Sequence, residues 1–136
     1  MAGYSGTPLL KKLGIKEGHQ CIIFNEPELY WDWLNPLPEG VQIKSKPVKQ
    51  SIDFIHLFVK EMKIFEKEYV KHKSLLKKEG MMWISWPKKS SKVVTDLDEG
   101  KIRDFGLANG LVDVKVCAVD EVWSGLKFVF RLKDRE

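Results

Sequence analysis

The stretch that decides the fold is Leu76-Lys77-Lys78-Glu79-Gly80-Met81-Met82-Trp83-Ile84-Ser85-Trp86-Pro87-Lys88-Lys89. A glycine after a lysine-rich turn is typical of a helix C-terminus, so we expect an amphipathic helix over residues 61–78 that stops at Gly80. Residues 81–86 lack alternation, which predicts a strand buried on both faces in the middle of an α/β sheet. Pro87 has no N–H for a sheet ladder, so the chain leaves the strand there, at the carboxyl edge, where open α/β sheets keep their ligand crevice.

Periodicity predicts the other elements. We expect a short helix that ends at Gly14, a helix capped by Asn25, and a helix that starts near Thr95 and Asp98. The predicted strands cover residues 20–24, 41–44 at an edge, 52–59, and a final hairpin of 111–119 and 126–132. This order predicts a three-layer α/β sandwich with a mainly parallel sheet and a C-terminal antiparallel hairpin.

Composition restricts the class of protein. The chain has 136 residues, of which 43% are hydrophobic, so we predict one α/β domain over residues 1–136 with 1–12 as an N-terminal arm. No apolar run approaches the ~20 residues that cross a bilayer, and the first residues do not form a signal peptide, which predicts a cytoplasmic protein. Basic residues outnumber acidic ones by 23 to 19, but nearly all are lysine, which disfavours specific reading of nucleic acid.

Titratable residues give no clear catalytic or metal signature. Cys21 and Cys117 lie in apolar strands, so we predict buried, reduced thiols. The three histidines lack cysteine or carboxylate partners at ligand spacing, so we predict no metal site. His56 lies inside an apolar strand, and we interpret it as a core residue whose polar atoms are satisfied.

Some segments resemble known families. Residues 13–18, residues 76–80, and the run from Gly106-Leu107 through the final hairpin resemble the framework of the Rossmann-like methyltransferases, over most of residues 13–132. More closely, the chain is similar to a bacterial family of small stand-alone proteins of unassigned function. That similarity is carried by Gly3-Tyr4-Ser5-Gly6-Thr7-Pro8-Leu9, residues 11–15, 112–121 and 123–128.

The methyltransferase resemblance implies a cofactor site that this chain lacks in part. It implies an acidic residue and a glycine-rich turn after the first strand, because only glycine lets the backbone approach the adenosyl cofactor, and an acidic residue for the ribose after the second strand. Asn25-Glu26-Pro27-Glu28 and Lys44-Ser45-Lys46 occupy these places, and a helix and a strand are missing before the third strand. We therefore predict no cofactor and no useful affinity for S-adenosylmethionine.

Three functions stay open. The first is a non-catalytic module that binds a small anionic ligand or a protein partner at the carboxyl edge, with the arm lying across that edge. Its candidate ligand-binding residues are Tyr4, Ser5, Thr7, Trp86, Lys88, Lys89, Trp123 and Ser124. The second is an enzyme of undefined reaction class, a degenerate methyltransferase, with His56, Asp53 or Ser85 as acid, base or nucleophile. The third is a nucleic-acid-binding accessory protein, with its contacts from Lys11, Lys12, Lys16, Lys88, Lys89 and Lys92.

Overall fold

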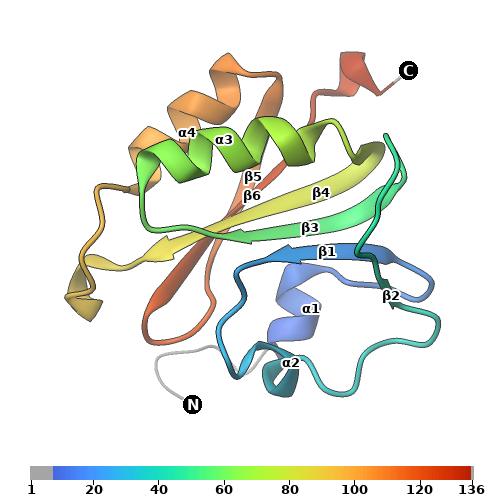
Figure 1. Ribbon diagram of the computed structural model, residues 1–136, viewed down its shortest axis with the longest axis horizontal. Helices are drawn as coiled ribbons and strands as arrows, with labels where there is room; N and C mark the ends of the chain where they lie inside the picture. The colour runs from blue at the N-terminus through green and yellow to red at the C-terminus, as the bar shows by residue number, and fades with distance from the viewer. Residues whose placement is uncertain (1–7, 136) are drawn as a thin grey trace.

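The computed structural model describes residues 8–135. Its helices and strands follow one another along the chain as shown in Figure 1. In order they are α1 (Leu9–Leu13), β1 (Gln20–Phe24), α2 (Tyr30–Trp33), β2 (Gln42–Ile43), β3 (Ile52–Phe58), α3 (Met62–Lys73), β4 (Leu76–Pro87), η1 (Lys89–Ser91), α4 (Glu99–Ala108), β5 (Leu111–Ala118), β6 (Trp123–Phe130) and η2 (Leu132–Asp134).

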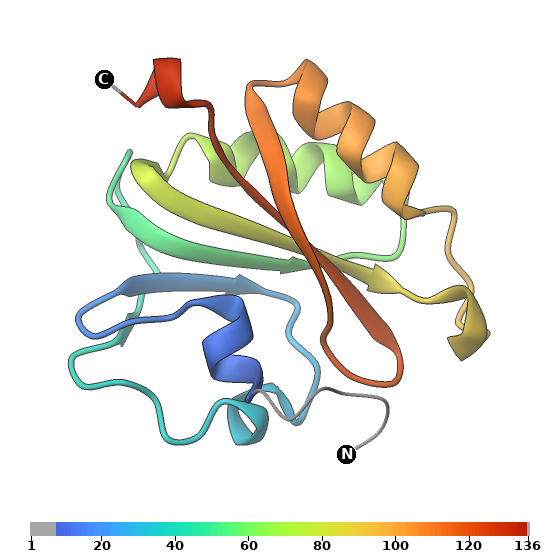
Figure 2. The same cartoon turned by 180° about the vertical axis from the view of Figure 1, so that it is seen from behind.

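The strands form one sheet in the order β2-β1-β3-β4-β6-β5. Strands β2, β1, β3 and β4 pair in parallel, whereas β6 runs antiparallel to both β4 and β5. Helices α3 and α4 lie on one face of the sheet, and α1 and α2 lie on the other (Figures 1 and 2). The structure therefore confirms the three-layer α/β fold, the mainly parallel sheet, the antiparallel hairpin and the edge position of β2.

A hydrophobic core fills each side of the sheet. Phe65 and Tyr69 of α3 and Ile102 of α4 pack on one face, while Leu13 of α1 and Tyr30 of α2 pack on the other. The central strand β4 contributes to both cores, because alternate side chains of a strand point to opposite faces. This confirms that the stretch over residues 81–86 is a central strand buried on both faces.

The predicted boundary between α3 and β4 is wrong. Helix α3 ends at Lys73, and β4 already begins at Leu76, so Gly80 lies inside a strand. Its position is crowded: a Cβ there would lie 2.7 Å from Leu76 Cδ1 and 3.0 Å from the carbonyl oxygens of Ile52 and Asp53. The β3–β4 pairing shifts register at this point, so the glycine permits a close backbone approach at a bulge and does not end a helix.

Two predicted helix caps also differ from the structure. Asn25 adopts a left-handed φ of 58°, and the helix that follows is only the four-residue α2, so Asn25 is a turn residue and not a cap. Helix α4 is capped by Asp98, which accepts a hydrogen bond from Lys101 N, whereas Thr95 donates to Lys60 O. Gly14 does close α1, with a left-handed φ of 86°, as predicted.

The two cysteines differ in exposure. Cys21 is only 1% exposed, which confirms a buried thiol, and burial raises its pKa to about 12. Cys117 is half-buried, so the prediction of full burial is wrong for this residue, which lies on the edge strand β5. Neither cysteine forms a disulfide.

Residues 8–135 contain neither a membrane-spanning helix nor a cluster of metal ligands. No helix in that range is long and apolar enough to span a membrane. No group of three or more histidine, cysteine, aspartate or glutamate side chains gathers there in a way that would hold a metal ion.

Candidate functional site

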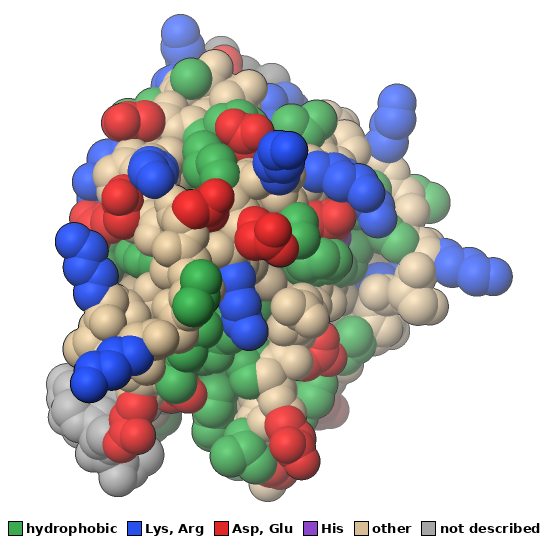
Figure 3. All heavy atoms as spheres, turned by 60° about the vertical axis from the view of Figure 1, so that its left-hand side comes forward, with side chains coloured by type: hydrophobic (Ala, Val, Ile, Leu, Met, Phe, Trp, Pro, Cys, Tyr) green, Lys and Arg blue, Asp and Glu red, His purple; other side chains and the backbone are tan. Residues whose placement is uncertain are grey.

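The carboxyl ends of β1, β3 and β4 meet at one edge of the sheet, on the left of Figure 1, and we call this the carboxyl edge. From β1 the chain passes to β2 on one side and then to β3 on the other, so the strand order reverses between β1 and β3. Such a reversal is where open α/β sheets bind their ligands. Figure 3, which turns this edge toward the viewer, shows a hollow low on the molecule with hydrophobic walls and acidic side chains on its rims.

The two tryptophans predicted to bind a ligand face opposite sides of the sheet. Trp86 is 6% exposed and packs in the core under α3 and α4, whereas Trp123 is 8% exposed and packs with Phe58 in the other core. Their strands are neighbours, and Trp86 pairs with Ser124 while Pro87 pairs with Trp123. Strand pairing therefore places Trp86 and Trp123 on neighbouring strands, but the two rings do not form a common aromatic surface.

Lys88 and Lys89 leave β4 directly beside the hairpin turn. Lys88 N donates a 2.7 Å hydrogen bond to Val122 O, which ties the end of β4 to the turn before Trp123. Lys88 is half-buried, and Lys89 is exposed at the start of η1. The predicted arm residues Tyr4, Ser5 and Thr7 lie outside the described residues.

The turn after β1 is built by Asn25. Its left-handed backbone gives the sharp bend that glycine would otherwise supply, and asparagine tolerates this conformation better than most residues. Its Nδ2 atom donates a 3.5 Å hydrogen bond to Phe58 O at the end of β3. The Asn25 side chain thus crosses from β1 to β3, over the place where the strand order reverses.

A shallow depression of about 480 Å³ lies at the end of β2, which pairs with Gln20 and Cys21 at the start of β1 and so lies away from the Asn25 turn, on the right of Figure 1. It is lined by residues 42–46, including Lys44 and Lys46. The backbone N–H of Lys44 donates to Cys21 O at 2.8 Å, which fixes the segment against β1. Within residues 8–135, neither lysine side chain forms an ion pair or a hydrogen bond with a carboxylate.

Several acidic groups near the carboxyl ends of β1, β3 and β4 already accept hydrogen bonds. Glu26 accepts from Trp31 Nε1 at 3.3 Å, and Asp96 accepts from Met62 N at 2.7 Å. Asp120 accepts from Val122 N and Trp123 N at 2.9 and 2.7 Å, which shapes the hairpin turn. Glu28, Glu61 and Glu121 remain exposed. Glu26 is thus held by α2, whereas Lys44 and Lys46 at the end of β2 have no carboxylate partner in residues 8–135 and are available to an anion.

His56 and Ser85 form a buried chain with Tyr30. Tyr30 Oη lies 2.9 Å from His56 Nδ1, and His56 Nε2 lies 2.7 Å from Ser85 Oγ. Both His56 and Ser85 are fully buried, and burial lowers the pKa of His56 to about 3 and raises that of Tyr30. His56 is thus the satisfied core histidine that the sequence predicts, because every polar atom of its ring has a partner and no solvent reaches it.

Asp53 lies at the other edge of the sheet, away from this chain. Its carboxylate accepts from Gln20 N at 2.8 Å and pairs with Lys77 Nζ at 3.0 Å, both near the starts of parallel strands. The three residues of the enzyme hypothesis therefore do not form one site. Sequence spacing did not show the Tyr30–His56 contact, since its members are 26 positions apart and lie on different elements.

The lysines of the nucleic-acid hypothesis form two separate groups. Lys11, Lys12 and Lys16 lie on α1 and the turn after it, whereas Lys88, Lys89 and Lys92 surround η1. Figure 2 shows α1 near the middle of the molecule and η1 at its far side.

Comparison with known proteins identifies the fold. No family model matches the chain, and no curated protein does. Solved structures do match. The crystal structure of an S-adenosylmethionine-dependent methyltransferase from Aquifex aeolicus is 14% identical, covering 90% of this chain and 88% of that one, with a TM-score of 0.56. The chain has the methyltransferase fold.

Two further structures agree on the methyltransferase fold. The Bacillus subtilis tRNA methyltransferase TrmK is 11% identical over 96% of this chain and 68% of its own, with a TM-score of 0.59. The complex of DhpI with SAH is 10% identical over 92% of this chain and 83% of its own, with a TM-score of 0.63. At these identities the likeness shows the fold alone, so the predicted methyltransferase framework is confirmed and the closer bacterial family stays a prediction.

The residues of the crevice do not fit S-adenosylmethionine in the place that the resemblance implies. Asn25 supplies the bend without glycine, but its side chain occupies the crossing from β1 to β3 that the cofactor would need. Lys44 and Lys46 follow β2, where the resemblance implies a carboxylate for the ribose hydroxyls, and lysine has no acceptor for those hydroxyls.

Proposed function

We propose that the protein binds a phosphorylated, nucleotide-type ligand at the end of β2. The observation that carries this proposal is the pair Lys44 and Lys46, which lines the depression at the end of β2 without a carboxylate partner in residues 8–135. In nucleotide-binding sheets an acid after the second strand selects a ribose hydroxyl, while a basic side chain accommodates a phosphate on that hydroxyl. The exchange of acid for lysine therefore favours a phosphate-bearing ligand.

The experiment compares two ligands that differ by one phosphate. Isothermal titration with NADP⁺ and NAD⁺ tests whether the 2′-phosphate adds affinity, with S-adenosylmethionine and S-adenosylhomocysteine as further ligands. We expect NADP⁺ to bind more tightly than the other three. Lys44→Gln and Lys46→Gln should each weaken NADP⁺ about tenfold, the scale of one charge-assisted hydrogen bond, and should leave NAD⁺ nearly unchanged. Lys133→Gln, on η2 and outside this depression, makes the same charge change and is the control. Equal affinity for NADP⁺ and NAD⁺ contradicts the proposal.

Methyl transfer from S-adenosylmethionine is the second candidate. The solved structures support an enzyme better than a non-catalytic module, since methyltransferases are the activity that their titles name. The left-handed turn at Asn25 also favours it, because the bend after β1 forms without glycine. Asn25→Gly removes the side chain that crosses to β3. Micromolar binding of S-adenosylmethionine by the unaltered protein, tightened further in Asn25→Gly, would establish this candidate over the first.

A further inference from the structure

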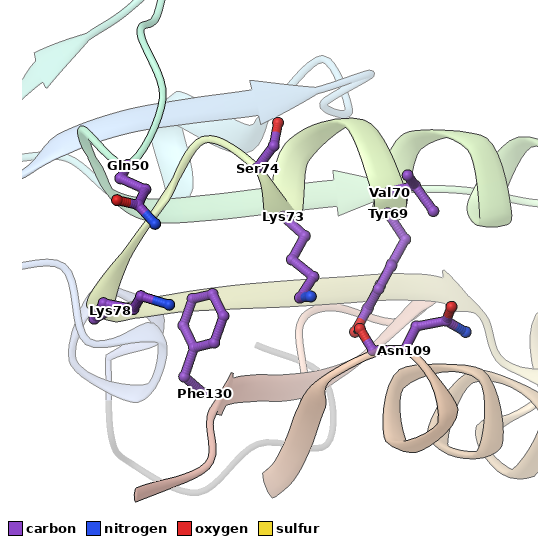
Figure 4. A pocket seen from close by; sticks show the side chains of 8 residues that line it. All are labelled: Gln50, Tyr69, Val70, Lys73, Ser74, Lys78, Asn109 and Phe130. Carbon is purple, nitrogen blue, oxygen red and sulfur yellow. The ribbon is translucent and has the colours of Figure 1, made fainter. Parts of the chain in front are cut away.

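A second pocket lies below the C-terminal end of α3, at the edge of the sheet opposite the carboxyl ends of β1, β3 and β4 (Figure 4). It has a volume of about 310 Å³, at the lower end of the range for small-molecule sites. We call it the amino-edge pocket, because its residues lie near the starts of β3, β4 and β5 and at the end of the antiparallel β6. They are Gln50, Tyr69, Val70, Lys73, Ser74, Lys78, Asn109 and Phe130.

Two ammonium groups meet over one aromatic ring in this pocket. Lys78 Nζ lies 4.8 Å from the centroid of the Phe130 ring, and Lys73 Nζ lies 5.8 Å from it. In Figure 4 Lys73 descends from α3 on one side of the Phe130 ring, and Lys78 comes from β4 on the other side. Each contact with the ring is favourable, and the same ring thus has two positive charges beside it.

No acidic side chain lines the amino-edge pocket or pairs with these lysines within residues 8–135. The adjacent Lys77 is different, since it pairs with Asp53 at 3.0 Å. The hydroxyls of the pocket are also engaged: Tyr69 donates to the carbonyls of Gly106 and Asn109, and Ser74 donates to Lys71 O. Lys73 and Lys78 are therefore the strong donors left to face the cavity.

The backbone is shaped to hold Lys73 in this position. Gly110 has a φ of +97°, and a Cβ there would lie 2.6 Å from Lys73 Nζ. A side chain at position 110 would thus be strained and would displace the ammonium group. The lysine is packed against the turn before β5 and does not simply extend into solvent.

We propose that the amino-edge pocket binds a phosphate monoester, with the phosphate held by the ammonium groups of Lys73 and Lys78 and an apolar part against Phe130 and Val70. A phosphate monoester carries close to two negative charges at neutral pH, which matches two lysines better than a carboxylate does. The volume exceeds that of a bare phosphate, and its walls include two aromatic rings and a valine side chain. This pocket shares no lining residue with the depression at the end of β2.

The test uses phenyl phosphate, inorganic phosphate and phenol with the full chain, followed by calorimetry and by amide shifts in NMR spectra. We expect phenyl phosphate to bind more tightly than inorganic phosphate, phenol to bind least, and the shifts to centre on Asn109 and Phe130. Lys73→Gln and Lys78→Gln should each weaken phenyl phosphate about tenfold, whereas Arg at either position should retain most of the affinity. Lys67→Gln, on the exposed side of α3, makes the same charge change outside the pocket.

Two results would overturn the proposal. One is binding of phenyl phosphate by the Lys73→Gln/Lys78→Gln double variant as tightly as by the unaltered protein. The other is an equal loss in Lys67→Gln, which would show a general surface-charge effect. Because Lys44 and Lys46 do not line the amino-edge pocket, Lys44→Gln and Lys46→Gln should not change phenyl phosphate binding, so failure of one proposed site is distinguishable from failure of the other.

Discussion

The buried chain from Tyr30 through His56 to Ser85 predicts how stability depends on pH. Burial lowers the pKa of His56 from 6.5 to about 3 in the folded protein. Between these values the unfolded chain binds a proton at His56 that the folded chain excludes, so stability falls as the pH falls. Each pH unit well inside this window corresponds to about 1.4 kcal/mol, so acidification from about pH 7 to about pH 5 should remove roughly 2 kcal/mol of unfolding free energy at this residue.

Urea denaturation at several pH values measures this effect. Most carboxylates stay ionised above about pH 5, which isolates histidine in the chosen range. His72 contributes in the same direction, because burial lowers its pKa as well. The decisive comparison is therefore between the unaltered protein and His56→Gln. The glutamine amide can still form hydrogen bonds with Tyr30 and Ser85, but it does not titrate. An equal loss of stability on acidification in both proteins would refute the reasoning, and His19→Gln serves as the control.

Two further perturbations follow from packing and exposure. Gly106→Ala on α4 should lower the unfolding free energy by about 1–3 kcal/mol, because the new Cβ would overlap the Phe128 ring. Gly100→Ala, near the start of the same helix, would place its Cβ 3.4 Å from Asp98 Oδ1 and should be neutral or stabilising. Thermal unfolding compares the two variants, and equal melting temperatures would contradict this account. Cys117 should react with a thiol reagent faster than Cys21, because it is half-buried and Lys12 and Lys115 partly oppose the rise in its pKa. Mass spectrometry of the labelled peptides reports the order, and faster labelling of Cys21 would show that its strand opens.

Sequence patterns predicted the elements that depend on local chemistry. Gly14 ends α1, the apolar run at residues 20–24 forms β1, and residues 81–86 form a strand buried on both faces. The sequence predicts a helix end at Gly80, whereas the structure has a strand bulge there, because a lysine-rich segment followed by glycine is compatible with both. The choice is made by the carbonyls of Ile52 and Asp53 on the neighbouring strand, which lie too close for any side chain.

The candidate sites depend on contacts between distant segments, which a sequence pattern does not contain. Strand register decides that Trp86 and Trp123 face opposite cores, although both neighbour the same edge. The sequence did not predict the amino-edge pocket either, because Lys73 and Lys78 belong to a lysine-rich run that is typical of a solvated helix face. They meet only because α3 ends at Lys73, which places Lys78 on β4 beside Phe130.

The place of β6 in the sheet has a consequence for how the chain is made. β6 is the last strand in sequence, yet it lies between β4 and β5 and supplies the hydrogen bonds that join them. During synthesis β4 therefore has an open edge, and β5 has no partner strand, until residues 123–130 have left the ribosome. The parallel half can pair earlier, because β2, β1, β3 and β4 are complete by residue 87. Assembly of the sheet should thus proceed in two steps, with the exposed apolar edge of β4 as the surface that chaperones meet in between.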